Sequence, residues 1–349
     1  MNFIKENVPI APLTTLRIGG RARYFVRAES EEDVIKAFEF AAQNALKIFI
    51  LGGGSNILVS DEGFDGLVIQ ILIKGVSFEN DDDEKTATAL VGAGEEWDDF
   101  VAACVAGNMQ GIECLSGIPG FVGGTPVQNV GAYGQEVSET IVMVRCFDRK
   151  TGTILELTNS ECGFSYRKSI FNSTKKERFV VLKVKYKLNI DGSPKIVYAD
   201  LQKHFDEKNP TLQETRDAVL KIRAAKSMVI DESDANSKSA GSFFKNPVVS
   251  KKVFERLQLS AKGGQLVPSF PVDDLNIKIP AAWLIEQAGF QKGYVKGNAG
   301  ISTNHTLALI NRGNSSAEDI VGLMTEIRLK VLEKFRIELE PDPVFVGFD

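Results

Sequence analysis

The stretch Leu51–Gly66, "LGGGSNILVSDEGFDG", places three consecutive glycines directly after "KIFIL" (Lys47–Leu51), a short apolar strand pattern. Glycines have no Cβ, so their backbone N–H groups can converge on an anion. The stretch lacks the G-x-G-x-x-G order before a helix that marks a Rossmann fold, and it lacks the terminal Lys-Ser/Thr of a P-loop. It therefore indicates either an anion-holding turn or a plain glycine turn between two strands.

Upstream of this turn, the sequence predicts a β-α-β unit. The run "ARYFVRA" (Ala22–Ala28) is typical of a strand. Ser30 and Asp33 form a capping pattern, and apolar residues follow them at helical spacing. The strand at Lys47–Leu51 would complete the unit, so we expect the glycine turn to follow a buried strand.

Downstream of the glycine turn, the sequence predicts mostly β-strands. Runs of β-branched residues separated by charged or glycine turns predict strands across residues 66–189. One helix interrupts them, in "EEWDDFVAACVAGN" (95–108).

After Pro210 the sequence predicts helices joined by long loops. The first has a capping box at Thr211 and Glu214, and the last long helix has a capping pattern at Ser315 and Glu318. We therefore expect the C-terminal region to form a separate α+β unit.

A second glycine-rich segment, "SGIPGFVGGTPVQNVGAYG" (Ser116–Gly134), lies in the strand-rich part. Ordering so many glycines costs conformational entropy, and this cost must be offset by binding or packing, so we do not interpret the segment as a plain connecting loop. It can wrap a large planar ligand closely. Together the two glycine stretches predict a dinucleotide held with its pyrophosphate on backbone amides.

Composition excludes several functional classes. The chain has 349 residues, a formal net charge of -5 and a pI near 5.4, so we expect two or three domains and no nucleic-acid surface. No apolar run approaches the ~18 residues of a membrane span, and the N-terminal stretch has no seven-residue apolar run that could act as a signal peptide. We expect a cytoplasmic protein that does not insert into membranes.

Cysteine and histidine usage limits the available chemistry. The four cysteines are widely spaced without a CxxC pair, so we interpret them as reduced core thiols and expect no metal site. With only two histidines, redox or acid–base chemistry must rest on a cofactor and other side chains.

A third unusual stretch, "SAGSFFKNP" (Ser239–Pro247), places Ser242 between a glycine and two phenylalanines. It shows neither strand alternation nor room for a helix. A glycine on one side and two large aromatic residues on the other are suited to fixing the Ser242 hydroxyl in position. A lone serine in a loop is, however, more often structural.

These stretches carry a family resemblance. The order "TTLRIGG", "GGGSNILVSDEGFDGLVI", "GIPGFVGGTPVQNVGAYGQEV", "FSYRKSIF", "AGSFFKNPVV", "PAAWLIEQAGF", "ALINRGNSSAEDIV" and "LEPDPVFVG" resembles the UDP-N-acetylenolpyruvoylglucosamine reductases, flavoenzymes of peptidoglycan precursor synthesis. The match runs from about Thr14 to Val346. "GGGSN" alone is shared with other flavoproteins of the vanillyl-alcohol-oxidase type.

The resemblance implies an α+β protein with a two-part FAD-binding region of the vanillyl-alcohol-oxidase (PCMH) type followed by an α+β substrate domain. The implied domains are residues 1–66, 67–205 and 206–349, with the last strand returning to the active site. The implied reaction uses NADPH to reduce non-covalent FAD, which then reduces the enolpyruvyl group of a UDP-sugar to give UDP-N-acetylmuramate. We expect a monomer whose partners are small molecules.

The resemblance also assigns catalytic roles. Ser242 is implied as the proton donor, and Arg167 as the bidentate clamp on the substrate carboxylate, a role that suits its planar fork. Asp342 stands where the family usually has glutamate, with Glu340 as a substitute candidate. Phe270 stands where members often have a tyrosine, which puts one substrate contact in doubt.

Binding residues follow from the same motifs. The residues implied to contact FAD are Gly52, Gly53, Gly54, Ser55, Asn56, Ser116, Gly117, Pro119, Gly120, Gly123, Gln128, Asn129, Gly131, Ala132 and Tyr133. The residues implied to contact the UDP-sugar are Tyr166, Tyr198, Lys226, Asn246 and Gln287. Tyr198 would belong to a mobile loop that folds over substrate and that a shorter branch of the family lacks.

Two rival functions stay open on the residues alone. A sugar or alcohol oxidase on the same FAD scaffold often tethers its flavin through a histidine, and neither glycine stretch contains one. A non-catalytic nucleotide-binding module would not need Ser242 and Arg167 together. Flavin released by acid precipitation would favour the reductase, and a colourless protein would favour the module.

Overall fold

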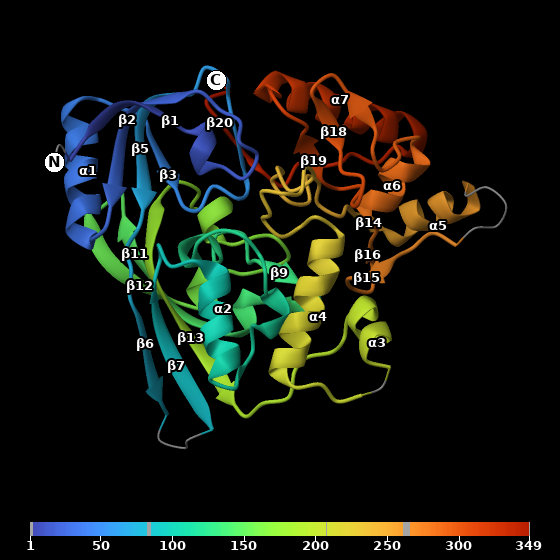
Figure 1. Ribbon diagram of the computed structural model, residues 1–349, viewed down its shortest axis with the longest axis horizontal. Coiled ribbons are helices and arrows are strands. Elements are labelled where there is room, and N and C mark those ends of the chain that lie inside the picture. The colour runs from blue at the N-terminus through green and yellow to red at the C-terminus, as the bar shows by residue number, and fades with distance from the viewer. Residues whose placement is uncertain (1–2, 82–84, 207, 261–265, 349) are drawn as a thin grey trace. The chain divides into compact units, whose positions relative to one another are not determined.

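The computed structural model describes residues 3–81, 85–206, 208–260 and 266–348 (Figure 1). The chain divides into two compact units that do not follow its order. Unit 1 comprises residues 1–8, 22–54 and 64–229, and unit 2 comprises residues 9–21, 55–63 and 230–349. The chain therefore passes from unit 1 to unit 2 inside the glycine turn, between Gly54 and Ser55.

The first sheet of unit 1 confirms the predicted β-α-β start. Its strand order is β1-β2-β5-β3, and β2 and β3 both run parallel to β5. The bounds are β1 Lys5–Pro9, β2 Arg21–Ala28, α1 Glu31–Gln43, β3 Ile48–Leu51 and β5 Phe64–Ile71. Ser30 caps α1 in a capping box with Asp33, as predicted.

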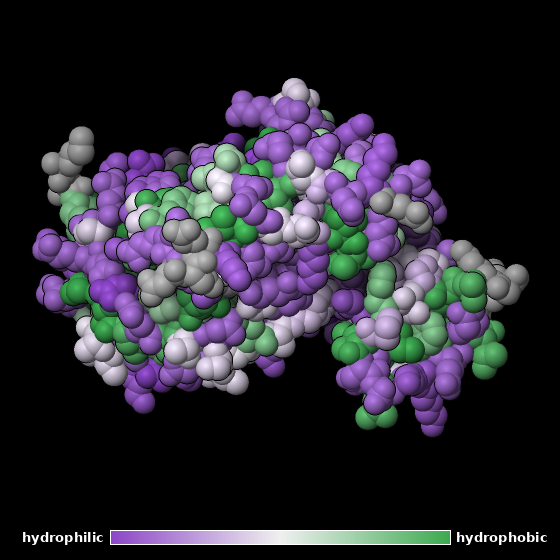
Figure 2. Space-filling view, turned by 90° about the horizontal axis from the view of Figure 1, so that it is seen from below, coloured by the Kyte–Doolittle hydropathy of each residue, from purple (hydrophilic) through white to green (hydrophobic). Residues whose placement is uncertain are grey.

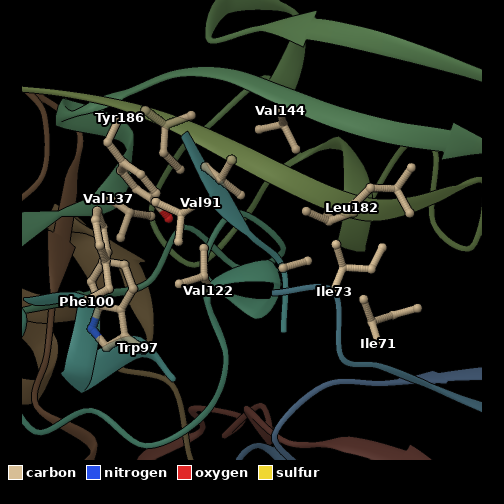
Figure 3. Packing of buried hydrophobic residues seen from close by; sticks show 14 of the residues in the cluster. Ile71, Ile73, Val91, Trp97, Phe100, Val122, Val137, Val144, Leu182 and Tyr186 are labelled. Carbon is tan, nitrogen blue, oxygen red and sulfur yellow. The ribbon is translucent and has the colours of Figure 1, made fainter. Parts of the chain in front are cut away.

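The second sheet of unit 1 is antiparallel, with strand order β12-β11-β13-β7-β6 and β8 paired to β13. Its bounds are β6 Val76–Asn80, β7 Thr86–Gly92, β8 Met109–Gln110, β11 Ile141–Asp148, β12 Thr153–Thr158 and β13 Phe179–Ile190. Figure 3 shows Trp97 and Phe100 of α2 (Trp97–Ala106) beside Tyr186 of β13 in the core. The buried Tyr186 hydroxyl lies 2.9 Å from Thr125 Oγ1. This contact ties the second glycine segment to the sheet.

The remaining elements of unit 1 are one small sheet and several helices. A two-stranded sheet pairs β9 (Gly131–Ala132) with β10 (Gln135–Glu136). Helices α3 (Ala199–Phe205) and α4 (Leu212–Ala225) follow β13. Thr211 caps α4 in the predicted capping box with Glu214. The short 3-10 helices of this unit are η2 Glu113–Leu115, η3 Val122–Gly124, η4 Val137–Glu139, η5 Ser160–Cys162 and η6 Ile170–Asn172.

Unit 2 packs its helices around short sheets. One sheet has the order β17-β18-β19, another β14-β16-β15, and β20 pairs in parallel with β4. The strand bounds are β4 Ile57–Val59, β14 Val248–Ser250, β15 Phe270–Pro271, β16 Asn276–Lys278, β17 Val295–Lys296, β18 Ala299–Ile301, β19 Leu309–Asn311 and β20 Val344–Val346. The helix bounds are η1 Ala11–Leu13, α5 Lys251–Ser260, α6 Ala281–Gln287 and α7 Ala317–Phe335. Figure 2 shows that apolar residues on the visible face form several patches between polar ones.

Two N-terminal segments contribute to unit 2. Leu16, Ile18 and Leu58 lie in the same buried cluster as the apolar residues of α6 and α7. The carboxylate of Asp61 accepts hydrogen bonds from the Ala317 N–H, with both oxygens at 2.9 Å. Segment 55–63 therefore stabilises the N-terminus of α7, where unpaired N–H groups favour a negative charge.

The predicted cap of α7 is wrong by one residue. Ser316 is the N-cap, and it forms the capping box with Asp319 instead of Ser315 with Glu318. Both serines fit the same sequence pattern. Ser315 is diverted because its hydroxyl donates to the Asn298 carbonyl and its N–H to Asn311 Oδ1.

Within the described ranges, no helix combines the length and apolar character needed to cross a membrane.

Candidate active site

In unit 1 the two glycine stretches touch through their backbones. A Cβ placed on Gly53 would lie 2.7 Å from Gly120 Cα, a separation that real Cβ contacts do not show. Among the residues that the structure describes, a Cβ on Gly52 or Gly124 would meet nothing within 4 Å. The stretches therefore form one surface that is closed at Gly53 and open at Gly52 and Gly124. Bare backbone facing open space fits a phosphate-bearing planar cofactor.

Side chains from two helices fix the start of the second stretch. The Gly117 N–H donates to Asp98 Oδ1 at 2.5 Å, and Arg223 Nε donates to the Gly117 carbonyl at 3.2 Å. Arg216 completes the group with a bidentate pair to Asp98 at 2.6 and 2.8 Å. Gly117 has φ +71°, so this peptide is held in a conformation that favours glycine.

The surroundings of Asp98 favour its carboxylate form. Burial raises the pKa of Asp98, but hydrogen bonds from Arg216 and the Gly117 N–H outweigh it and hold the pKa below its ordinary value. Sequence analysis missed Asp98, Arg216 and Arg223. Nothing in a single sequence distinguishes Arg223, only 7% exposed, from a surface arginine of a helix.

Asn129 joins the second glycine stretch to the proposed carboxylate clamp. Its side chain is buried, and Nδ2 donates to Glu136 Oε2 at 2.7 Å and to the Ser165 carbonyl at 3.1 Å. Its Oδ1 accepts from the Ser138 N–H at 3.1 Å. The side chain of Asn129 thus serves to position the stretch.

Arg167 lies at the tip of a tight turn. Ser165 and Lys168 exchange N–H···O bonds of 2.9 and 3.0 Å across Tyr166 and Arg167. Arg167 has φ +55°, a left-handed conformation that costs a non-glycine residue about 1–2 kcal/mol. A half-buried arginine held in this strained conformation points to a functional demand on that side chain.

Three residues proposed from the sequence come together at the end of α4. The rings of Tyr133 and Tyr198 meet edge to face with centroids 5.3 Å apart. Lys226, the C-cap of α4, pairs with Asp200 Oδ2 at 2.8 Å. Burial lowers the pKa of Lys226, but the bond to Asp200 outweighs it and raises the pKa above its ordinary value. A charged lysine beside two tyrosines suits a diphosphate.

In unit 2 the Ser242 loop is rigidly held. Phe243 and Phe244, which follow the serine, are 0% and 2% exposed, and the Phe243 N–H donates to the Leu307 carbonyl at 2.8 Å. Ser242 Oγ lies 3.5 Å from Nε2 of His305. Sequence analysis missed His305 because 63 residues separate it from the serine.

The final strand approaches the same loop. The Asp342 N–H donates to the Phe243 carbonyl at 3.0 Å, and Phe244 forms a bridge with Pro341. Asn56 Nδ2 donates to the Asp342 carbonyl at 3.2 Å. The structure therefore brings Asn56, Asp342 and the Ser242 loop together within unit 2.

The other unit 2 residues lie on nearby elements. Asn246 Oδ1 accepts from the Ala281 N–H at 2.8 Å, so Asn246 holds the N-terminus of α6. Gln287 ends α6, and its carbonyl accepts from Lys334 Nζ. Phe270 in β15 is 46% exposed, with Lys278 Nζ 5.9 Å from its ring centroid.

Comparison with known proteins defines the class first. Residues 22–158 match the model of an FAD binding domain, and residues 232–346 match that of the "UDP-N-acetylenolpyruvoylglucosamine reductase, C-terminal domain". The fold and the glycine-lined site are thus those of an FAD-binding flavoprotein. The expected α+β fold class of the vanillyl-alcohol-oxidase type and the expected FAD are confirmed.

Full-length relatives give the family, and this chain belongs to the UDP-N-acetylenolpyruvoylglucosamine reductase family. It is 44% identical to that reductase of Thermobifida fusca, covering 98% of both chains. It is 46% identical to the one of Salinispora arenicola, covering 96% of this chain and 93% of the relative. The crystal structure of the Thermus caldophilus enzyme matches 99% of this chain and 100% of its own, with TM-score 0.67 and 26% identity.

Proposed function

We propose that this chain is an NADPH-dependent UDP-N-acetylmuramate dehydrogenase. It reduces the enolpyruvyl group of UDP-N-acetyl-3-O-(1-carboxyvinyl)-glucosamine, and the product is UDP-N-acetylmuramate. The observation that carries the proposal is that relatives named for this activity match nearly the whole chain at more than 40% identity. The rigid Ser242 loop supports it, because such a reduction needs a fixed proton donor.

The reaction adds a hydride and a proton across the carbon–carbon double bond of the enolpyruvyl group. Bound non-covalently, FAD supplies the hydride that it takes from NADPH. The chain's own residues must bind the substrate carboxylate, stabilise the charge that develops beside it, and donate the proton.

We assign the proton to Ser242 Oγ. Buried Phe243 and Phe244 fix the loop, and misplacement by about 1 Å can cost ~100-fold in rate. The His305 imidazole at 3.5 Å is placed to return a proton to the serine. Arg167 binds the substrate carboxylate. Asp342, beside the serine loop, takes the place of the family's glutamate.

Cofactor and substrate are held by the remaining site residues. The glycine backbones around Gly53 and Gly120 hold FAD, and Ser55 and Asn56 continue that loop into unit 2. The UDP-sugar diphosphate binds Tyr198 and Lys226, with Tyr166, Asn246 and Gln287 as further contacts. Cytoplasmic location, a monomeric state and the three-part division at residues 66/67 and 205/206 stay predictions.

The test is product identity. Purified protein is incubated with NADPH and the enolpyruvyl UDP-sugar, and the sugar is analysed by mass spectrometry. The proposal predicts a product heavier by two hydrogens that forms only when NADPH is present. Oxygen consumption with a sugar or alcohol, and no reduced UDP-sugar, would instead support the oxidase.

A further inference from the structure

A buried carboxylate, Glu113, lies outside the groups used above. It is 0% exposed and begins η2, three residues before the second glycine segment. Three N–H groups converge on it. Oε2 accepts from the Gly111 N–H at 2.8 Å, and Oε1 accepts from Gln135 Nε2 at 2.7 Å and from the Lys195 N–H at 3.1 Å.

Two neighbours of Glu113, Cys114 and Gln135, link the two ends of the glycine segment. Gln135 follows directly after the segment, and its Oε1 accepts from the Cys114 N–H at 2.8 Å while its Nε2 donates to Glu113. The side chains of Gln135 and Glu113 are both buried. The side chain of Gln135, after the segment, therefore accepts a hydrogen bond from Cys114 and donates one to Glu113, both before the segment.

Glu113 and Cys114 also hold the chain that leads to Tyr198. The Lys195 N–H donates to Glu113, and the Lys195 carbonyl accepts from Cys114 Sγ at 3.4 Å. Three residues further on, Tyr198 packs against Tyr133 of the glycine segment. A Cβ on Gly134 would lie 2.3 Å from Val197 Cγ2, so the chain also passes close to the end of the segment at Val197.

We propose that Glu113 is a positioning residue that anchors the Tyr198 segment (Lys195–Tyr198) to the base of the flavin-holding glycine segment. The anchor holds the base of the Tyr198 segment, at Lys195, in register with the glycine segment, and from this base Tyr198 reaches the substrate diphosphate. The inference rests on the proposed function. A carboxylate is required because three donors face it, whereas a glutamine would turn its own N–H groups toward some of them.

The kinetic test is a double-mutant cycle between Glu113→Gln and Tyr198→Ala. We expect Glu113→Gln to raise the KM for the enolpyruvyl UDP-sugar about tenfold, as stranded buried donors do, and to spare flavin reduction by NADPH. If the carboxylate acts through the tyrosine, the double variant binds no worse than Tyr198→Ala alone. Additive effects would overturn the proposal.

Glu139→Gln is the matched control. Glu139 Oε2 pairs with Lys195 Nζ at 2.8 Å on the surface of the same segment, with both side chains more than a third exposed. Its loss should leave KM unchanged. A KM rise as large as that of Glu113→Gln would show that any contact of Lys195 suffices and would overturn the specific role of Glu113.

Amide hydrogen exchange tests the anchor without substrate. In flavin-loaded Glu113→Gln, exchange across residues 195–198 should accelerate about tenfold while the β13 amides stay protected. Unchanged exchange would overturn the anchor. If Glu113→Gln fails to fold, Cys114→Ala replaces it and should accelerate the same amides less strongly. If Tyr198→Ala leaves KM normal, the role proposed for Tyr198 falls and with it the kinetic part of this inference, whereas the exchange result still decides the anchor.

Discussion

The backbone N–H of Asp342 donates to the carbonyl oxygen of Phe243, 3.0 Å away, one residue beyond Ser242. This bond fixes the register between the C-terminal strand and the serine loop. Glu340, two residues earlier, has a 72% exposed side chain and pairs with Lys245 Nζ at 2.6 Å. The register therefore favours Asp342 over Glu340 as the acid beside Ser242.

Exchanging these two acids for amides tests the register. Asp342→Asn should slow enolpyruvyl reduction about 100-fold, the scale of a misplaced group at the reacting centre, and spare flavin reduction by NADPH. Glu340→Gln loses an exposed ion pair worth less than about 1 kcal/mol and should be nearly silent. Stopped-flow traces of each half-reaction measure both. A crippled Glu340→Gln beside an active Asp342→Asn would exchange the two roles.

Arg167 offers a test that separates stability from activity. Its left-handed conformation suits glycine, so Arg167→Gly should keep or raise the free energy of unfolding, by up to about 1 kcal/mol. Substrate reduction should nevertheless collapse, because the carboxylate clamp is gone.

Arg167→Lys is the companion change, which keeps the charge but loses the planar fork. Denaturant unfolding and single-turnover reduction measure the pair. Near-normal turnover in Arg167→Lys would place this side chain outside the site.

The glycine surface gives a matched pair of alanine variants. A Cβ at Gly53 would press on the Gly120 backbone, so Gly53→Ala should destabilise the flavin-free protein by about 1–3 kcal/mol. A Cβ at Gly52 points into open space, so Gly52→Ala should leave the flavin-free protein as stable as the wild type and weaken FAD binding. Thermal unfolding and flavin titration distinguish the two effects. If Gly52→Ala binds FAD normally, the open side of this surface does not face the cofactor.

Ser242→Ala should separate the two half-reactions. Flavin reduction by NADPH should stay normal, while substrate reduction should slow by about 10²–10⁴-fold because the proton donor is absent. His305→Asn should affect the same step less strongly. Equal losses in both half-reactions would mean that Ser242 holds the cofactor site together and does not donate the proton.

Local signals in the sequence predicted local features well. The capping patterns at Ser30 and Thr211 and the glycine turn after a strand all lie within a few residues, where propensity and hydrogen bonding decide the outcome. Such local signals do not say which buried cluster a segment joins, as Leu16 and Leu58 illustrate. Their place in unit 2 depends on packing against residues more than 200 positions away.

The site was predicted only as far as motifs reach. Contacts such as Ser242 with His305, or Arg223 with Gly117, join residues 63 and 106 positions apart. A single sequence carries no record of such pairs, since the side chains of both partners look ordinary in isolation. Only the folded structure shows that these residues are in contact.

The most direct test of the proposed reduction is an anaerobic visible spectrum of the purified, flavin-loaded protein. NADPH should bleach the flavin absorbance, and the enolpyruvyl UDP-sugar added afterwards should restore it without oxygen. Flavin that bleaches with NADPH but recovers only when oxygen is admitted would contradict the account.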